Sequence, residues 1–118
     1  MLSFGNKRIY LACGHTDMRK SINGLAAVVE GSFKLDPFEE SVFVFCNRSR
    51  DRIKILEWDG DGFWLYFKRL EKGRFKWPTV NGSEATMILN NNEILHLLGS
   101  PKVIQKLMRK EVKIGAVI

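Results

Sequence analysis

The fold is decided by the stretch RIKILEWDGDGFWLYFKRL, residues 52–70. Apolar and polar side chains alternate in the first half, aromatic residues crowd the second half, and Asp-Gly-Asp-Gly at 59–62 separates them. Alternation with a period of two indicates a strand with one buried face, and an aspartate- and glycine-rich tetrapeptide between two such runs indicates a hairpin turn. This stretch therefore predicts two antiparallel strands, 52–58 and 63–70.

The N-terminal half predicts two more strands with a helix between them. Residues 8–13 and 42–46 are short, mostly apolar runs bounded by polar turns, which is typical of buried strands. Residues 18–30 carry apolar side chains at helical spacing. Thr16 or Asp17 is the predicted N-cap of this helix, and Gly31 is its predicted end.

The C-terminal third predicts short elements. A turn at 71–74 leads to Phe75-Lys76-Trp77 and is stopped by Pro78, and residues 86–89 predict a short strand. Asn90 or Asn91 caps a helix that Gly99 closes, and residues 101–110 again show helical spacing.

This order of elements predicts an α+β fold, with a mostly antiparallel sheet (a β-meander) and helices packed on one face. The chain has 118 residues and no repeat or linker-like segment, so we expect a single domain over 1–118. The cysteines, Cys13 and Cys46, are expected to be free, buried thiols. No apolar run approaches a membrane span, and residues 1–8 lack the apolar core of a signal peptide, which predicts a cytoplasmic protein with no membrane partner.

The positive charge is concentrated around the hairpin. The net charge of the chain is +6, and the segment 48–76 holds nine Lys and Arg against five Asp and Glu. A basic surplus of this kind favours encounter with polyanions, although it says nothing about the fold.

The pairing register of the hairpin decides which side chains accompany these cations. If Trp58 lies opposite Gly62, with a three-residue loop and a glycine bulge, Ile53, Ile55, Leu65 and Phe67 form a core layer. The opposite face then carries Arg52, Lys54, Leu56, Trp64, Tyr66 and Lys68. Cations interleaved with aromatic rings suit nucleic acid, because cations contact phosphates and rings stack on exposed bases. The alternative is that both faces are covered, the aromatic rings belong to the core, and the cationic stems lie over apolar surface with their charges in water.

A second candidate contact precedes the first helix. Arg19 and Lys20 fall in the predicted first turn, where the helix dipole is positive, so a bound phosphate would complement them. The alternative is that Thr16 or Asp17 caps the helix while both cations point into water.

Catalytic and metal-binding patterns are weak. The Cys and His residues lack zinc-site spacing, and Asp59 and Asp61 fall in a turn without the other ligands of a calcium loop. We therefore predict no enzyme, no metal and no cofactor. A metal-dependent nuclease that uses Asp59 or Asp61 is a third and weaker hypothesis.

Several blocks of the sequence together resemble a known family. They are Thr16-Asp17-Met18-Arg19-Lys20, Gly24-Leu25, Asp36-Pro37, Val42-Phe43-Val44-Phe45, Asp51-Arg52-x-Lys54, Trp58-Asp59-Gly60-Asp61-Gly62, Lys68-Arg69-Leu70-Glu71-x-Gly73-Arg74-Phe75 and Trp77-Pro78. In this order they resemble the insertion-sequence-66-type accessory protein, called TnpB or Orf2-like, which is unrelated to the RNA-guided nuclease of the same name. The resemblance covers about residues 1–98, and 99–118 is expected to be a variable helical tail. It implies a role in transposition beside a separate transposase, and it supplies no established catalytic residues.

The residues and the resemblance together predict a non-catalytic accessory protein of insertion-sequence transposition that binds DNA, at element ends or target. The predicted DNA-binding residues are Arg19, Lys20, Arg48, Arg50, Arg52, Lys54, Trp64, Tyr66, Lys68, Arg69, Arg74 and Lys76. The alternative is a protein-interaction module that docks onto the transposase through Trp58, Trp64, Tyr66 and Trp77, because aromatic residues dominate interface hot spots. Assembly into a homo-oligomer is left open.

Overall fold

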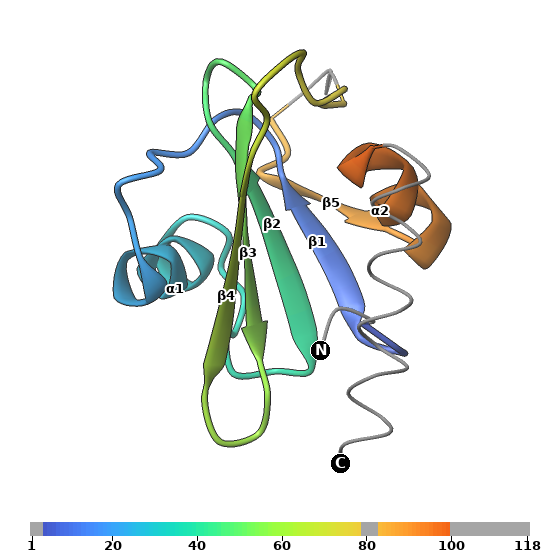
Figure 1. Ribbon diagram of the computed structural model, residues 1–118. Coiled ribbons are helices and arrows are strands. Elements are labelled where there is room, and N and C mark those ends of the chain that lie inside the picture. The colour runs from blue at the N-terminus through green and yellow to red at the C-terminus, as the bar shows by residue number, and fades with distance from the viewer. Residues whose placement is uncertain (1–3, 79–82, 100–118) are drawn as a thin grey trace.

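The computed structural model describes residues 4–78 and 83–99, which form a five-stranded sheet with one helix against each face (Figure 1). The elements in chain order are β1 (Arg8–Ala12), α1 (Ile22–Gly31), β2 (Ser41–Cys46), β3 (Arg52–Trp58), β4 (Phe63–Arg69), β5 (Thr86–Leu89) and α2 (Asn91–Leu98). The helix expected at 101–110 lies outside the described residues.

The strand order in the sheet is β4-β3-β2-β1-β5. β1 and β2 are parallel and are connected through α1, whereas the other three neighbouring pairs are antiparallel. The ends of β1, β2 and β4 therefore meet the beginnings of β3 and β5 at one end of the sheet. The predicted α+β fold with a mostly antiparallel sheet is confirmed.

The two helices cover opposite faces, so the prediction that the helices share one face is wrong. Leu25 and Val29 of α1 pack with Phe43, Phe45 and their neighbours on one side. The other side carries α2 together with the buried rings of the segment that follows β4. The buried residues of this second core are Phe4, Ile9, Leu11, Val42, Val44, Cys46, Ile53, Ile55, Phe75, Trp77, Leu89, Ile94, Leu97 and Leu98. Every residue of β2 is buried, and a strand that is apolar on both faces requires a cover on both.

The boundaries of the elements follow local signals with one exception. The N-cap of α2 is Asn90, whose side chain accepts from the Glu93 backbone while the Glu93 side chain accepts from the Asn90 backbone. This reciprocal capping box explains why that helix starts where the sequence predicts. In contrast, α1 begins at Ile22 rather than at Met18, and its N-cap is Ser21.

The two cysteine thiols and the length of the helices bear on two further predictions. Cys13 and Cys46 are both free, as predicted, but only Cys46 is buried, since Cys13 is half-exposed. Within the described ranges, no helix combines the length and the apolar character that crossing a lipid bilayer requires.

Candidate nucleic-acid interface

The β3–β4 hairpin pairs one residue out of the predicted register. Trp58 lies opposite Phe63, so residues 59–62 form a four-residue connection, and the Asp59 N–H donates to the Gly62 carbonyl over 2.8 Å. The prediction that Trp58 faces Gly62 is therefore wrong. A shift of one residue moves every β4 side chain to the other face of the sheet. Phe67, which was predicted to lie in the core, is instead opposite Lys54.

The predicted face that combines Trp64 and Tyr66 with the cations of β3 is consequently not formed. Tyr66 is opposite Ile55, packs against the α2-side core and donates its hydroxyl to Glu57 Oε1 over 2.8 Å. Trp64 is 49% exposed on that same side, where its Nε1 donates to Asp59 Oδ2. Lys68 also lies on the α2 side, with Nζ 3.5 Å from the Leu98 carbonyl oxygen.

The position of Tyr66 makes the protein sensitive to alkali. Burial raises the pKa of its hydroxyl, and the hydrogen bond to the Glu57 carboxylate raises it further. Above pH of about 10 the unfolded chain loses this proton while the folded chain keeps it, so stability falls as the pH rises. Between pH 8 and pH 11 we expect Tyr66→Phe to lose less stability than the wild type does. The difference should be on the order of 1 kcal/mol, because partial solvent access limits the rise in the Tyr66 pKa. Urea midpoints at the two pH values measure this, and parallel curves for the two proteins would contradict it.

Lys54 is tied to the backbone. Its Nζ donates to the carbonyl oxygens of Met18 and Lys20, at 2.8 Å in each case, and lies 5.8 Å from the centre of the Phe67 ring. Lys54 therefore holds the loop before α1 against β3, a structural role that no pattern in the sequence indicates.

Arg19 and Lys20 precede α1, so the prediction that they lie in its first turn is wrong. Asp17 Oδ1 accepts the Arg19 backbone N–H over 2.9 Å, and the Lys20 N–H donates to the Asp17 carbonyl. This turn competes with helix formation and delays it to Ile22. The Arg19 side chain also pairs with the Asp17 carboxylate, and its hydrogen bonds lower the pKa of Asp17 to about 2.

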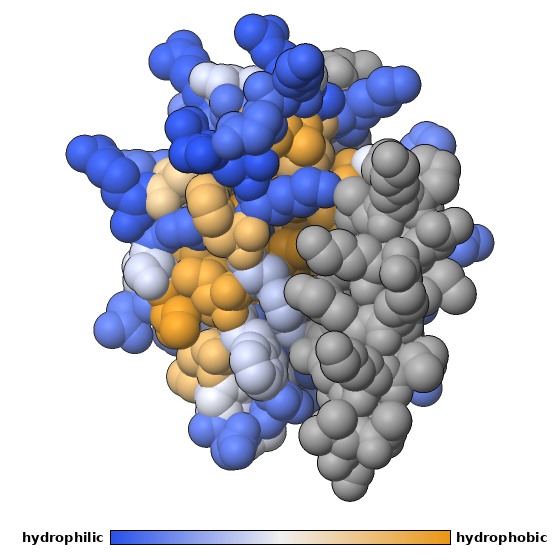
Figure 2. All heavy atoms as spheres, viewed as in Figure 1, coloured by the Kyte–Doolittle hydropathy of each residue, from blue (hydrophilic) through white to orange (hydrophobic). Residues whose placement is uncertain are grey.

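Most of the predicted cations gather at one end of the sheet. The segments 47–52 and 69–76 hold seven cations and two carboxylates, and both segments lie where β2 ends, β3 begins and β4 ends (Figure 1). We call this set the basic end: Arg48, Arg50, Arg52, Arg69, Lys72, Arg74 and Lys76. All seven are exposed except Arg52, which is half-exposed. Figure 2 shows the corresponding hydrophilic surface at the top of the molecule.

Backbone contacts fix the two segments against each other. The Phe75 N–H donates to the Arg50 carbonyl, and the Leu70 N–H donates to the Asp51 carbonyl, both over 2.7 Å. Within the first segment, Asn47 Oδ1 accepts the backbone N–H groups of Asp51 and Arg52. The Asn47 amide also hydrogen-bonds the Asp51 carboxylate, which lowers the pKa of Asp51. These hydrogen bonds hold together the two backbone segments that carry the cations.

The other end of the sheet is acidic. The segment 36–40 before β2 and the segment 57–62 at the end of β3 and in the loop to β4 contain six carboxylates and no Lys or Arg: Asp36, Glu39, Glu40, Glu57, Asp59 and Asp61. Two cations lie at the same end, Arg8 opposite Ser41 and Lys7 paired with Glu57, so the carboxylates remain in excess. Charge is therefore polarised along the strand direction. Such a field orients the molecule as it approaches a polyanion.

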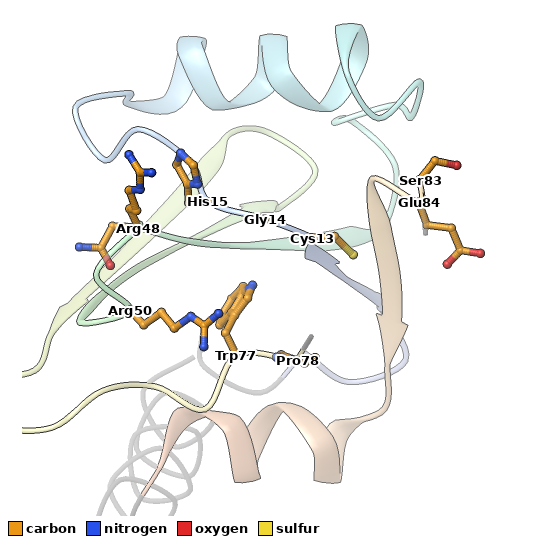
Figure 3. A pocket seen from close by; sticks show the side chains of 10 residues that line it. Cys13, Gly14, His15, Arg48, Arg50, Trp77, Pro78, Ser83 and Glu84 are labelled. Carbon is orange, nitrogen blue, oxygen red and sulfur yellow. The ribbon is translucent and has the colours of Figure 1, made fainter. Parts of the chain in front are cut away.

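A pocket of ≈ 530 Å³ opens between the basic end and the ends of β1 and β2 (Figure 3). Arg48, Arg50 and the Trp77 indole line it together with Cys13, Gly14, His15, Asn47, Pro78, Ser83 and Glu84. Burial raises the pKa of the Cys13 thiol, and it raises that of Cys46 to about 11, so neither is a thiolate at neutral pH. Across 4–78 and 83–99, the His, Cys, Asp and Glu side chains form no group of three or more that could hold a metal ion. The pocket offers cationic and aromatic contacts for a ligand.

The amino-acid sequence matches a known protein family. The model described as IS66 Orf2 like protein matches residues 7–106. The chain is 44% identical over 77 residues to the uncharacterized protein y4hO of Sinorhizobium fredii, which is 65% of this chain and 67% of that protein. It is 40% identical over 73 residues to the uncharacterized protein y4jC of the same organism, which is 62% of each chain. No solved structure matches. The chain therefore belongs to the IS66 Orf2-like family and is a transposition-related accessory protein.

Proposed function

We propose that the basic end binds the DNA backbone during transposition, at the element ends or the target, and that the protein contributes no chemistry of its own. The observation that carries this proposal is the grouping of seven cations on two segments that backbone hydrogen bonds hold together. Positive side chains on a fixed framework match a row of phosphates at low cost in conformational entropy.

The ion pairs already present at this end do not prevent such binding. Arg69 contacts Glu71 at 2.9 Å, and Arg52 contacts Asp51 at 3.7 Å, and all four side chains are at least partly exposed. Exposed pairs of this kind contribute little to stability, so a phosphate can replace the carboxylate partner. The acidic end repels DNA, so the molecule approaches with the basic end leading.

The test compares two double charge reversals that change the net charge equally. Arg48→Glu/Arg74→Glu alters the basic end, whereas the matched control, Arg8→Glu/Lys34→Glu, alters exposed cations elsewhere. Binding of the full chain to duplex DNA with element-end sequence is followed by fluorescence anisotropy over a range of salt. We expect the first variant to bind more weakly and to reduce the slope of log affinity against log salt by about two, because two phosphate contacts are lost. The control should retain the wild-type slope. Equal losses in both variants would show that net charge alone matters and would contradict the proposal.

Docking onto the transposase is a second candidate, supported by a cluster of aromatic rings at the acidic end. Phe38 is 53% exposed, and its ring centre lies 5.1 Å from that of Trp58 and 5.4 Å from that of Phe63. Co-purification with the transposase that survives nuclease, high salt and the Arg48→Glu/Arg74→Glu change would favour this function.

A further inference from the structure

We propose that the face of the sheet around Phe67 accepts unpaired bases, so that the protein prefers single-stranded DNA to duplex DNA. This inference rests on the proposed function, because the phosphates of the same strand would be held by the neighbouring cations of the basic end. It goes further by naming the form of DNA and the ring on which a base stacks.

Phe67 is an exposed ring on a rigid support. It lies on the edge strand β4, and 56% of its surface is open to solvent. Its cross-strand neighbour Lys54 is anchored by two backbone carbonyls, with Nζ 5.8 Å from the ring centre. Figure 2 shows apolar side chains at the surface over β4, below the hydrophilic loops. The exposed ring is therefore accessible to a base that stacks on it.

A cleft next to this ring has room for a base. Its volume is ≈ 670 Å³, within the range of pockets that hold small ligands. The apolar part of its lining comes from Met18, Leu65 and Phe67, and the polar part from Asp17, Arg19, Asn47, Arg52 and Lys54. Apolar walls with cations around them fit a nucleotide better than they fit an apolar peptide, because a base is planar and its phosphate is anionic.

The cations nearest to Phe67 lie on the same face of the sheet as its ring. In the hairpin register Arg52 is opposite Arg69, and Lys54 is opposite Phe67, so all four side chains share the α1 face. Arg69 is thus two residues from Phe67 along β4, and it belongs to the basic end. A base stacked on Phe67 would have its flanking phosphate close to Arg52 and Arg69. Duplex DNA cannot make this contact, since its base faces are covered by neighbouring base pairs, whereas a single strand offers a π face at every nucleotide.

The experiment measures the affinity of the full chain for an oligothymidine of about 20 nucleotides and for a duplex with the same number of phosphates, at one salt concentration. Three variants are compared with the wild type. Phe67→Leu keeps an apolar side chain and removes the ring, Phe67→Trp keeps a ring, and Phe38→Leu is the matched control at a similarly exposed phenylalanine outside this face.

We expect the wild type to bind the oligothymidine more tightly than the duplex. Phe67→Leu should weaken binding of the single strand by about 5-fold to 150-fold, the loss of one stacked base, and leave duplex binding within about twofold. Phe67→Trp and Phe38→Leu should retain single-strand binding.

The failure of this inference is separable from that of the proposed function. If the wild type binds both DNA forms equally well and Phe67→Leu changes neither, the preference for single strands is overturned while backbone binding stands. If the full chain binds neither form, both proposals fail. If Phe67→Leu leaves both DNA affinities intact but abolishes co-purification with the transposase, Phe67 contacts a protein, and the inference is wrong.

Discussion

Replacing Lys7 with Met is expected to lower the free energy of unfolding by about 3 kcal/mol, because it leaves a buried carboxylate without its cation. Glu57 is only 3% exposed, and its Oε2 lies 2.9 Å from Lys7 Nζ. The same Nζ donates to the Trp58 carbonyl over 2.9 Å, so two acceptors lose a donor at once. Since small domains are stable by only about 5–15 kcal/mol, the change would be a large fraction of the total. Urea unfolding of the full chain measures it.

A double variant distinguishes loss of the ion pair from general disruption at this position. Replacing both partners, in Lys7→Met/Glu57→Leu, removes the unpaired charge, so stability should recover in part relative to Lys7→Met alone. Recovery should be incomplete, since the Tyr66 hydroxyl loses its acceptor at Glu57 Oε1. The exposed Arg19–Asp17 pair provides the contrast, and Arg19→Met should leave the urea midpoint close to that of the wild type. A Lys7→Met protein that unfolds at the wild-type urea concentration would refute the expectation.

Local signals in the sequence were sufficient to predict most elements. The strands β3 and β5 occupy the predicted residues, 52–58 and 86–89, and α2 begins after its predicted cap. Each depends on a pattern within a few residues, either alternation or a capping side chain. The late start of α1 shows the limit of such signals. Thr16 or Asp17 was predicted to cap this helix, but the N-cap is Ser21, and the Asp17 side chain organises a turn ahead of the helix.

The register of the hairpin could not be predicted, because Asp-Gly-Asp-Gly is compatible with both a three-residue and a four-residue loop. The difference of one residue exchanged Phe67 for Trp64 and Tyr66 on the face that carries Lys54. The sequence therefore predicted an aromatic ring on the face that carries Lys54, but not that this ring is Phe67. No pattern within the hairpin distinguishes Phe67. Its exposure follows from its place on the edge strand β4, opposite the anchored Lys54 of β3.

Two other features of the site depended on topology. The apolar run in β2 is typical of a strand covered on both faces, so the placement of the two helices on opposite faces was within reach of the sequence. In contrast, the sequence did not predict that the cations gather at one end of the sheet. Their concentration between residues 48 and 76 was evident, but they meet at one end only because β2, β3 and β4 run antiparallel in turn and the segment after β4 folds back onto the loop at 47–51.

Trp77 tests whether that returning segment is part of the core or an exposed anchor for the transposase. The indole is 7% exposed, belongs to the α2-side core and donates Nε1–H to the Ala12 carbonyl over 3.1 Å. Trp77→Ala should therefore cost about 3–5 kcal/mol of stability, through lost burial and a cavity. Trp77→Phe keeps most of the apolar contact but removes the donor to the Ala12 carbonyl, so its loss of stability should be smaller, about 1–3 kcal/mol.

Urea unfolding of Trp64→Ala supplies the matched control for Trp77→Ala, because 49% of the Trp64 surface is already in solvent. We expect a loss of about 1–2 kcal/mol, clearly smaller than that of Trp77→Ala, because about half of the Trp64 ring is buried and its hydrogen bond goes to the exposed Asp59. An interface anchor would behave in the opposite way from a core residue: its removal would weaken partner binding while leaving the isolated chain equally stable. If Trp77→Ala unfolds like the wild type but no longer co-purifies with the transposase, the segment is an interface. A large loss of stability would instead show that Trp77 fixes residues 71–78, and with them Lys72, Arg74 and Lys76, against the end of β1.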